Sequence, residues 1–316
     1  MDYNYLGRTD LKVSKLCYGT LTIGPLQRNL SIEDSVQLFE EAINNGINFF
    51  DTAELYKTYT HLRAGIECFG RNKFIISTKS YAYDEETAKR SLDKALNEMK
   101  TDYIDIFSLH EQESEHTLRG HNKAIEYFYK MKEEGIIKAL GLSTHHIAGV
   151  IAGTKSSYID IIHPIINVKG LGIQDGTIDE MLEAVKNAYE AGKGIYAMKI
   201  LGGGNLINMS EECFDFVLNL KYLHSIAIGM QSIEEIKANA LRINNIKIPE
   251  ALKCSINSTQ RKLHIDTWCE QCCQCMKHCS HGALSILDNK IIVDETKCVL
   301  CGYCSAWCPQ FCIKII

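Results

Sequence analysis

Residues 74–110 read FIISTKSYAYDEETAKRSLDKALNEMKTDYIDIFSLH. Two short apolar runs, FIISTK (74–79) and YIDIFSLH (103–110), flank the amphipathic stretch DEETAKRSLDKALNEMK (84–100). Acidic residues open that stretch and Lys100 closes it, which suits the dipole of a helix. The segment therefore predicts a strand, a helix and a second strand. Two strands joined through a helix pair in parallel.

The same alternation extends in both directions. A further helix is expected over SIEDSVQLFEEAINNG (31–46), from a Ser31 N-cap to Gly46. Six more strand-like runs are KLCYGT (15–20), NFFDTA (48–53), IIKALGLS (136–143), IDIIHPII (159–166), GIYAMKI (194–200) and SIAIG (225–229). Eight strands alternating with helices over about 250 residues fit a (β/α)8 barrel better than an open doubly wound sheet.

Composition excludes several classes of protein. The 316 residues carry a formal net charge of −5, so no basic field points to nucleic acid. No run of about 18 apolar residues suggests a membrane span, and the polar start MDYNYLGRTDLKVSK (1–15) lacks the core of a signal peptide. We therefore expect a cytoplasmic protein that binds neither nucleic acid nor membrane.

Cysteine is unevenly distributed along the chain. Ten of the 14 cysteines lie in the last 48 residues. There the spacing C-x2-C-x2-C-x3-C begins at Cys269 and recurs 29 positions later at Cys298. We therefore expect two domains, a barrel over 1–252 and a small α+β domain over 253–316. A hairpin is expected around Asp288-Asn289, and the tail FCIKII (311–316) offers a further strand.

The cysteine spacing predicts two [4Fe–4S] clusters. Three thiolates at x2-x2 intervals hold one cluster, and the fourth cysteine of each motif ligates the other. One set is then Cys269, Cys272, Cys275 and Cys308, and the other is Cys298, Cys301, Cys304 and Cys279. The alternative is a cysteine-rich zinc module, although zinc sites normally take two separated pairs. The segment resembles a bacterial-type two-cluster ferredoxin, with Ser280 where that family usually has proline.

Four ionisable residues follow three neighbouring strands of the predicted barrel. Asp51 ends its strand with Tyr56 five residues later, and Lys79 and His110 end the next two strands. Because barrel active sites gather at the carboxyl ends of the strands, we expect these side chains to converge. Taken singly, each side chain could instead cap a helix, pack at the rim or in the core, or remain exposed to solvent.

The residue types indicate proton transfer to a carbonyl. A phenol has a pKa near 10, and a neighbouring ammonium would lower that pKa. Tyr56 is then the general acid and Lys79 its electrostatic partner, with Asp51 holding Lys79. His110 would orient the carbonyl oxygen of the substrate.

Several blocks of the sequence resemble the aldo-keto reductase superfamily. They are YLGRTDLKVSKLCYGT (5–20), DTAELY (51–56), STKS (77–80) and DYIDIFSLH (102–110). The resemblance implies a (β/α)8 TIM barrel and NAD(P)H-dependent carbonyl reduction by a Tyr-His-Lys-Asp tetrad. It also implies that this chain is similar to a subset with a C-terminal two-cluster ferredoxin domain.

The resemblance also implies cofactor-binding positions. Ser143 and Thr144 stand where the family usually has Ser-Asn, His163 replaces a glutamine, and Met198 stands where many members stack a tyrosine on nicotinamide. Lys199 and the glycine-rich loop after it are expected near pyrophosphate. The implied positions are Gly19, Thr20, Leu21, Ser143, Thr144, His163, Met198, Lys199, Leu201, Gly202, Gly229, Met230, Ser232, Glu235 and Asn239.

Glu235 bears on the choice between NADH and NADPH. Many NADPH-dependent members have arginine at this place. A carboxylate repels a 2′-phosphate but accepts hydrogen bonds from a ribose 2′-hydroxyl. We therefore expect NADH to be used at least as well as NADPH.

The role of the predicted clusters stays open at this point. The first interpretation is a reductase of a small carbonyl or alcohol substrate whose clusters exchange electrons with it or with a redox partner protein. Alternatively, the barrel binds nicotinamide without carbonyl turnover and the protein transfers electrons, or the clusters are purely structural. Hydride carries two electrons and each cluster one, and the sequence shows no convincing flavin motif.

Overall fold

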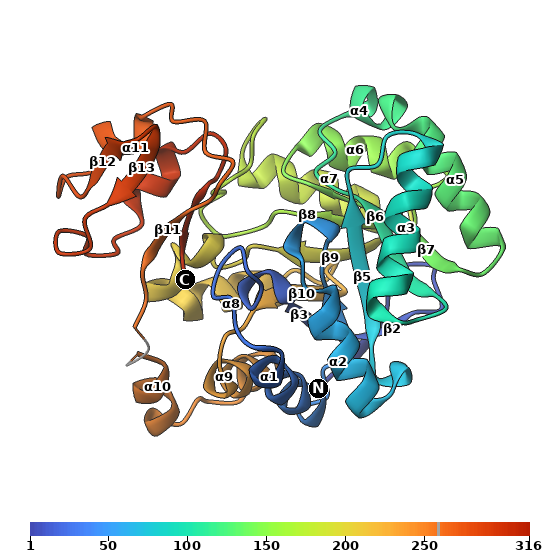
Figure 1. Cartoon of the computed structure of the whole chain (residues 1–316), viewed down its shortest axis with the longest axis horizontal. Coiled ribbons are helices and arrows are strands. Elements are labelled where there is room, and N and C mark those ends of the chain that lie inside the picture. The colour runs from blue at the N-terminus through green and yellow to red at the C-terminus, as the bar shows by residue number, and fades with distance from the viewer. Residues whose placement is uncertain (258–259) are drawn as a thin grey trace.

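A closed barrel of eight parallel strands forms the body of the molecule (Figure 1). The computed structural model describes residues 1–257 and 260–316. The strands are β3 (Leu16–Gly19), β4 (Phe49–Asp51), β5 (Ile75–Ser80), β6 (Ile104–Leu109), β7 (Ile137–Thr144), β8 (Ile161–Pro164), β9 (Gly194–Met198) and β10 (Ser225–Gly229). Their order around the barrel follows the chain, and β10 closes on β3. Each strand lies within or overlaps a predicted run, so the barrel prediction is confirmed.

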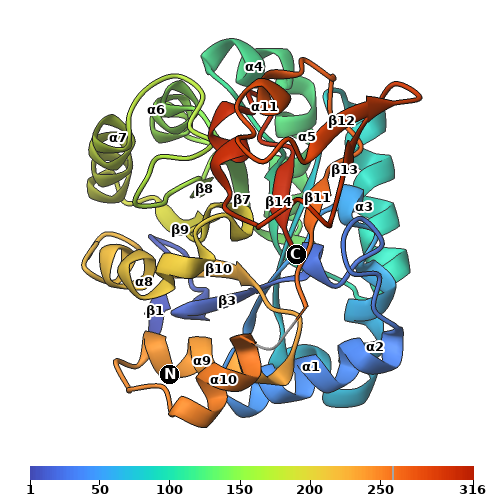
Figure 2. The same cartoon turned by 90° about the vertical axis from the view of Figure 1, so that its left-hand side faces the viewer.

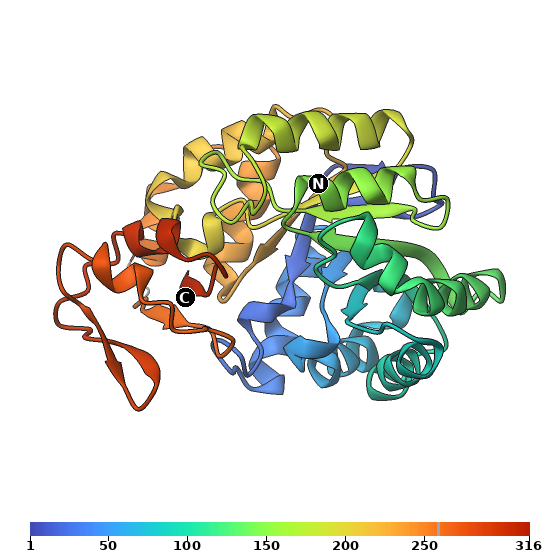
Figure 3. The same cartoon turned by 90° about the horizontal axis from the view of Figure 1, so that it is seen from above.

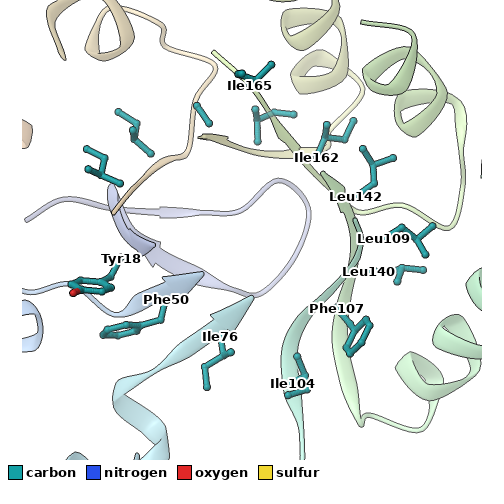
Figure 4. Packing of buried hydrophobic residues seen from close by; sticks show 14 of the residues in the cluster. Tyr18, Phe50, Ile76, Ile104, Phe107, Leu109, Leu140, Leu142, Ile162 and Ile165 are labelled. Atoms are coloured by element: carbon teal, nitrogen blue, oxygen red, sulfur yellow. The ribbon is translucent and has the colours of Figure 1, made fainter. Parts of the chain in front are cut away.

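The barrel strands are apolar on both faces because both faces are buried. Successive side chains of a strand point to opposite faces. Phe49 and Ile106 accordingly belong to a cluster in which strand residues pack together, whereas Phe50 and Phe107 belong to the larger cluster shared with the helices. Figure 4 shows Phe107 and Leu140 on the helix-facing side of their strands.

Helices cover the outside of the barrel. They are α1 (Ile32–Asn44), α2 (Tyr59–Phe69), α3 (Glu85–Met99), α4 (Glu115–Gly120), α5 (Asn122–Glu133), α6 (Ile147–Lys155), α7 (Ile178–Glu190), α8 (Ser210–Leu218) and α9 (Ile233–Ile243), followed by α10 (Glu250–Asn257) and α11 (Gln274–Lys277). Helix α1 has the predicted Ser31 cap, whose hydroxyl accepts a hydrogen bond from the Asp34 N–H at 3.0 Å. Asp84 caps α3 in a reciprocal pair with Thr87. None of the helices in the described ranges is long and apolar enough to cross a bilayer.

An N-terminal hairpin was not predicted. Strands β1 (Tyr3–Tyr5) and β2 (Lys12–Ser14) pair antiparallel and bring Leu6 and Val13 into the inner apolar cluster of the barrel. Three-residue strands are too short to produce a recognisable period-2 pattern.

The C-terminal residues form two small antiparallel sheets with an apolar cluster of their own. Strand β11 (Leu263–Ile265) pairs with β14 (Ile313–Ile315), and β12 (Leu284–Leu287) pairs with β13 (Lys290–Val293). Asp288 and Asn289 both have positive φ, as the predicted hairpin turn requires. This part lies in front of the barrel in Figure 2 and at one end of the molecule in Figure 3.

Contacts join the C-terminal part to the barrel loops. Phe311 is 1% exposed and belongs to the main hydrophobic core of the barrel. The Asn205 side chain donates to the Ile313 carbonyl at 3.0 Å. The predicted domain boundary at residues 252 and 253 falls within α10.

Candidate active site at the barrel mouth

Asp51 and Lys79 form a buried ion pair at the end of neighbouring strands. Lys79 lies in β5, and its amine is 2.7 Å from both carboxylate oxygens of Asp51 and from the Thr52 carbonyl. The two side chains are 1% and 7% exposed. All three ammonium donors therefore have an acceptor, and the ion pair fixes the position of the Lys79 amine.

Tyr56 and His110 lie beside this pair. Tyr56 ends a short 3-10 helix (Glu54–Tyr56) after β4 and is partly exposed. The Lys79 amine is 5.2 Å from the centre of the Tyr56 ring, and the His110 ring is 5.8 Å away in an edge-to-face arrangement. The structure thus brings the four predicted side chains together. Their catalytic roles stay a prediction.

One expectation about Tyr56 is wrong. Burial raises its pKa well above the ordinary value, and the Asp51, Glu111 and Asp266 carboxylates raise it further. The Lys79 charge does not reverse this effect because Asp51 already compensates it at 2.7 Å. A phenol in these surroundings stays protonated at neutral pH, which is the form that donates a proton.

His110 is held neutral. Burial lowers its pKa to about 3. Its ring stacks on Tyr81 with 4.6 Å between ring centres, and its backbone N–H donates to the Ser80 carbonyl at 2.9 Å. Within residues 1–257 and 260–316 the buried Nδ1 atom has no hydrogen-bond partner. A neutral imidazole can donate one hydrogen bond, which suits the predicted role on a carbonyl oxygen.

Tyr196 is a member of the Asp51 network that the sequence did not reveal. Its hydroxyl donates to the Asp51 carboxylate at 3.0 Å and lies 2.8 Å from the Ser77 hydroxyl. His163, predicted to contact the cofactor, stacks on the Tyr196 ring at 3.8 Å. The His163 Nδ1 atom contacts the Tyr196 carbonyl at 2.6 Å, and Nε2 lies 3.9 Å from Asp51. Tyr196 lies inside an apolar strand run, where nothing in the pattern marks it as polar.

Most of the other predicted cofactor positions lie in loops and strand ends at the same mouth. Gly19 pairs with Gly229 across β3 and β10, and a Cβ atom on Gly229 would come within 2.2 Å of the Thr22 side chain. The Ser143 hydroxyl accepts from the Glu111 N–H at 2.9 Å. Further positions are Thr20, Leu21, Thr144, Met198, Leu201, Gly202 and Met230. The structure leaves their roles as predictions.

At the start of α9, Glu235 has a partner that the sequence did not predict. Ser232 caps this helix, and the Glu235 carboxylate accepts from the Gln231 N–H at 2.8 Å. Its other oxygen forms an ion pair with Arg261 at 2.6 Å, with only 14% and 11% of the two side chains exposed. The position thus holds a carboxylate and a guanidinium together. Asn239, the predicted adenine contact, accepts from Arg242 at 3.1 Å.

The predicted cluster cysteines lie in the C-terminal part, and their role as ligands stays a prediction. The residues that line one hollow include Cys279, Cys298, Cys301 and Cys304, the four predicted ligands of one cluster. Burial raises the pKa of Cys275 to about 11. The thiols of Cys308, Cys269 and Cys272, which belong to the same predicted ligand set as Cys275, raise it further.

The thiol donor set fits the group that the spacing implies, since such clusters are held by four cysteine thiolates. Across the described ranges, no group of three or more His, Cys, Asp or Glu side chains is arranged to hold a metal ion. Each thiolate of a [4Fe–4S] cluster binds a different iron, so its sulfurs surround a cube and do not meet at one point.

Comparison with known proteins identifies the family. The sequence profile of the Aldo/keto reductase family matches residues 15–217. The L-galactose dehydrogenase of Arabidopsis thaliana is 23% identical over 77% of this chain and 88% of its own length. The oxidoreductase YqkF of Bacillus subtilis is 23% identical over 78% of this chain and 92% of its own. The holo structure of the aldo-keto reductase AKR11C1 from Bacillus halodurans superposes with a TM-score of 0.65 at 20% identity, over 81% of this chain and 95% of that one.

A (β/α)8 barrel with ionisable side chains gathered at the carboxyl ends of its strands is the architecture of a barrel enzyme. The chain belongs to the aldo/keto reductase family and is an NAD(P)H-dependent oxidoreductase.

Proposed function

We propose that the protein interconverts a small aldehyde or ketone and its alcohol, with Tyr56 as the general acid. The observation that carries this proposal is the convergence of Tyr56, His110 and the Lys79–Asp51 pair at one barrel mouth. A bound nicotinamide supplies or accepts the hydride in this chemistry.

The chain's own residues account for the proton and for the orientation of the carbonyl. Tyr56 stays protonated because burial and nearby carboxylates raise its pKa, and it donates its proton to the carbonyl oxygen. Neutral His110 donates a hydrogen bond to the same oxygen. Lys79 lies beside the phenol, where its charge offsets the repulsion between the Asp51 carboxylate and the phenolate left after proton transfer. Asp51 and Tyr196 hold Lys79 in that position.

Replacement of Tyr56 tests this proposal. Tyr56→Phe removes the proton donor and keeps the ring, and we expect kcat/KM for carbonyl reduction to fall by about 10²- to 10⁴-fold. Tyr83→Phe is the matched control because Tyr83 is 57% exposed. NADH or NADPH binding, followed by protein fluorescence, should survive in both variants. Full activity in Tyr56→Phe would refute the assignment.

We further propose that residues 253–316 form a domain with two [4Fe–4S] clusters that transfer electrons. The repeated spacing and the cavity lined by four of the cysteines support this proposal. Dense thiols of this kind suit a reducing compartment, which favours the cytoplasm. A redox partner protein would take or supply single electrons.

Metal analysis after anaerobic purification tests the cluster proposal. About eight iron and eight sulfide per chain are expected for two clusters. Cys304→Ser should remove about half of the iron, whereas Cys68→Ser in the barrel should remove none. Zinc in place of iron would favour the zinc module. Clusters that cannot be reduced at accessible potentials would favour a structural role.

A further inference from the structure

Lys199 is a cation at the barrel mouth that the proposed reaction does not use. It follows β9 with a positive φ of 58°, and its amine lies 2.7 Å from Nε2 of His145, which follows β7. The Lys199 amine is also 5.1 Å from the centre of the Phe311 ring. Lys199 and His145 are both partly exposed, so a ligand at the mouth can reach them.

Two of the other charged groups around Lys199 are lysines that pair with carboxylates. Lys79 pairs with Asp51 at 2.7 Å, and Lys314 lies 3.6 Å from Asp266. Glu111 accepts a hydrogen bond from the Tyr81 hydroxyl. Lys199 differs from all of these, because no ion pair forms at its amine within the described parts of the chain and its nearest polar partner is an imidazole. The Glu111 and Asp266 carboxylates act on Lys199 from a distance, without an ion pair to its amine within the described residues.

Lys199 lies close to the catalytic groups. Its charge is among those that lower the pKa of His110 and of His145, which places it within electrostatic reach of both. Burial, followed by the charge of Lys314, lowers the pKa of Lys199 itself to about 7. The Glu111 and Asp266 carboxylates oppose this lowering without reversing it.

We propose that Lys199 and His145 form an anion subsite at the same mouth of the barrel as the predicted catalytic groups, so that the substrate is a carbonyl compound carrying a carboxylate or a phosphate. The inference rests on the carbonyl chemistry proposed above. It also reassigns Lys199, which the sequence predicted to contact pyrophosphate. The amine reaches across β8 from its own strand to His145 and to Phe311 of the C-terminal part.

Paired substrates test the subsite. Succinic semialdehyde is compared with butyraldehyde, and glyceraldehyde 3-phosphate with glyceraldehyde, so that the two anionic groups are tested separately. The readout is the ratio of kcat/KM for the charged compound to that for its neutral partner. A hydrogen bond to a charged group accounts for about a 10- to 100-fold change. Lys199→Met should lower the ratio by that factor for at least one pair, and Lys199→Arg should restore part of it.

The matched control is Lys186→Met, because Lys186 is 60% exposed on α7 and should leave the ratio unchanged. A second readout is calorimetric binding of succinate and of inorganic phosphate to the wild-type and Lys199→Met proteins. Weaker binding of either anion in the variant, with NADH and NADPH affinity unchanged, supports the subsite even if no carbonyl is turned over, in which case the proposed function alone fails. An unchanged ratio together with unchanged anion binding would overturn the inference. Loss of NADH and NADPH affinity with an unchanged ratio would instead indicate that Lys199 binds the pyrophosphate of the cofactor, as the sequence predicts.

Discussion

Replacing Lys79 by methionine should destabilise the protein as well as inactivate it. The ammonium is 1% exposed and has three oxygen acceptors at 2.7 Å, two of them on Asp51. In Lys79→Met the Asp51 carboxylate stays buried and keeps the Tyr196 hydroxyl and a distant His163 as partners. Loss of one partner of a buried ion pair costs about 3–5 kcal/mol.

This loss is large compared with the total stability of about 5–15 kcal/mol that is usual for folded proteins. Urea unfolding at pH 7.5, followed by far-UV circular dichroism, measures the change. With a slope of about 2–3 kcal/mol per molar urea, the midpoint should fall by about 1–2.5 M. Lys186→Met, on the surface, should shift it little.

The double variant Lys79→Met/Asp51→Asn separates the two causes of instability. It removes both charges, so it should be more stable than Lys79→Met alone if the uncompensated carboxylate is the main cost. A loss below about 1 kcal/mol in Lys79→Met would refute the reasoning. An equal loss in the single and double variants would refute it too, because lost packing would then be the cause.

Three further predictions concern cofactor choice, pH dependence and a second ion pair. Wild-type enzyme should use NADH at least as well as NADPH. Glu235→Gln should raise the NADPH/NADH ratio of kcat/KM because it removes a charge that repels a 2′-phosphate. Arg261→Met should lower the same ratio because it removes a charge that attracts the 2′-phosphate. A ratio that neither variant changes would place the pair away from the cofactor. Burial lowers the pKa of His163 to about 4, below the ordinary 6.5, so the stability that it contributes is present above pH 6.5 and is lost as pH falls toward 4. His163→Gln should therefore flatten the dependence of the unfolding free energy on pH between 6.5 and 4, and an unchanged slope would contradict this. Arg71→Met should cost about 3–5 kcal/mol in urea unfolding because it leaves Asp105 buried without its partner at 2.6 Å, and a midpoint like that of wild type would show that the pair is dispensable.

The sequence revealed the barrel because its strands are buried on both faces. Runs such as FIISTK (74–79) and YIDIFSLH (103–110) carry that signal locally. The hairpin of β1 and β2 does not carry it, since three residues cannot show a period. The grouping of Tyr56, Lys79 and His110 followed from their places at strand ends, which needs only the topology of a barrel.

The electrostatic state of the site could not be predicted in the same way. The raised pKa of Tyr56 depends on burial and on Asp266, which is 210 positions away in the sequence. The effect of the Glu235 charge on cofactor choice likewise depends on Arg261, whose guanidinium lies 2.6 Å from the Glu235 carboxylate. Such pairs follow from packing between distant segments, and neither residue carries a local pattern that points to the other.

These interactions join the C-terminal residues to the candidate active site. Arg261 compensates Glu235, Asp266 acts on Tyr56, and Phe311 packs in the main core beside Lys199 and His145. A barrel ending at residue 252 would leave Glu235 without its guanidinium and would expose the apolar surface that Phe311 covers. If the cysteines hold the two proposed clusters, binding of those clusters would also set the positions of Arg261, Asp266 and Phe311, because metal binding is coupled to folding. Cluster assembly would therefore affect carbonyl chemistry through packing alone, even if no electron passes between the clusters and the nicotinamide.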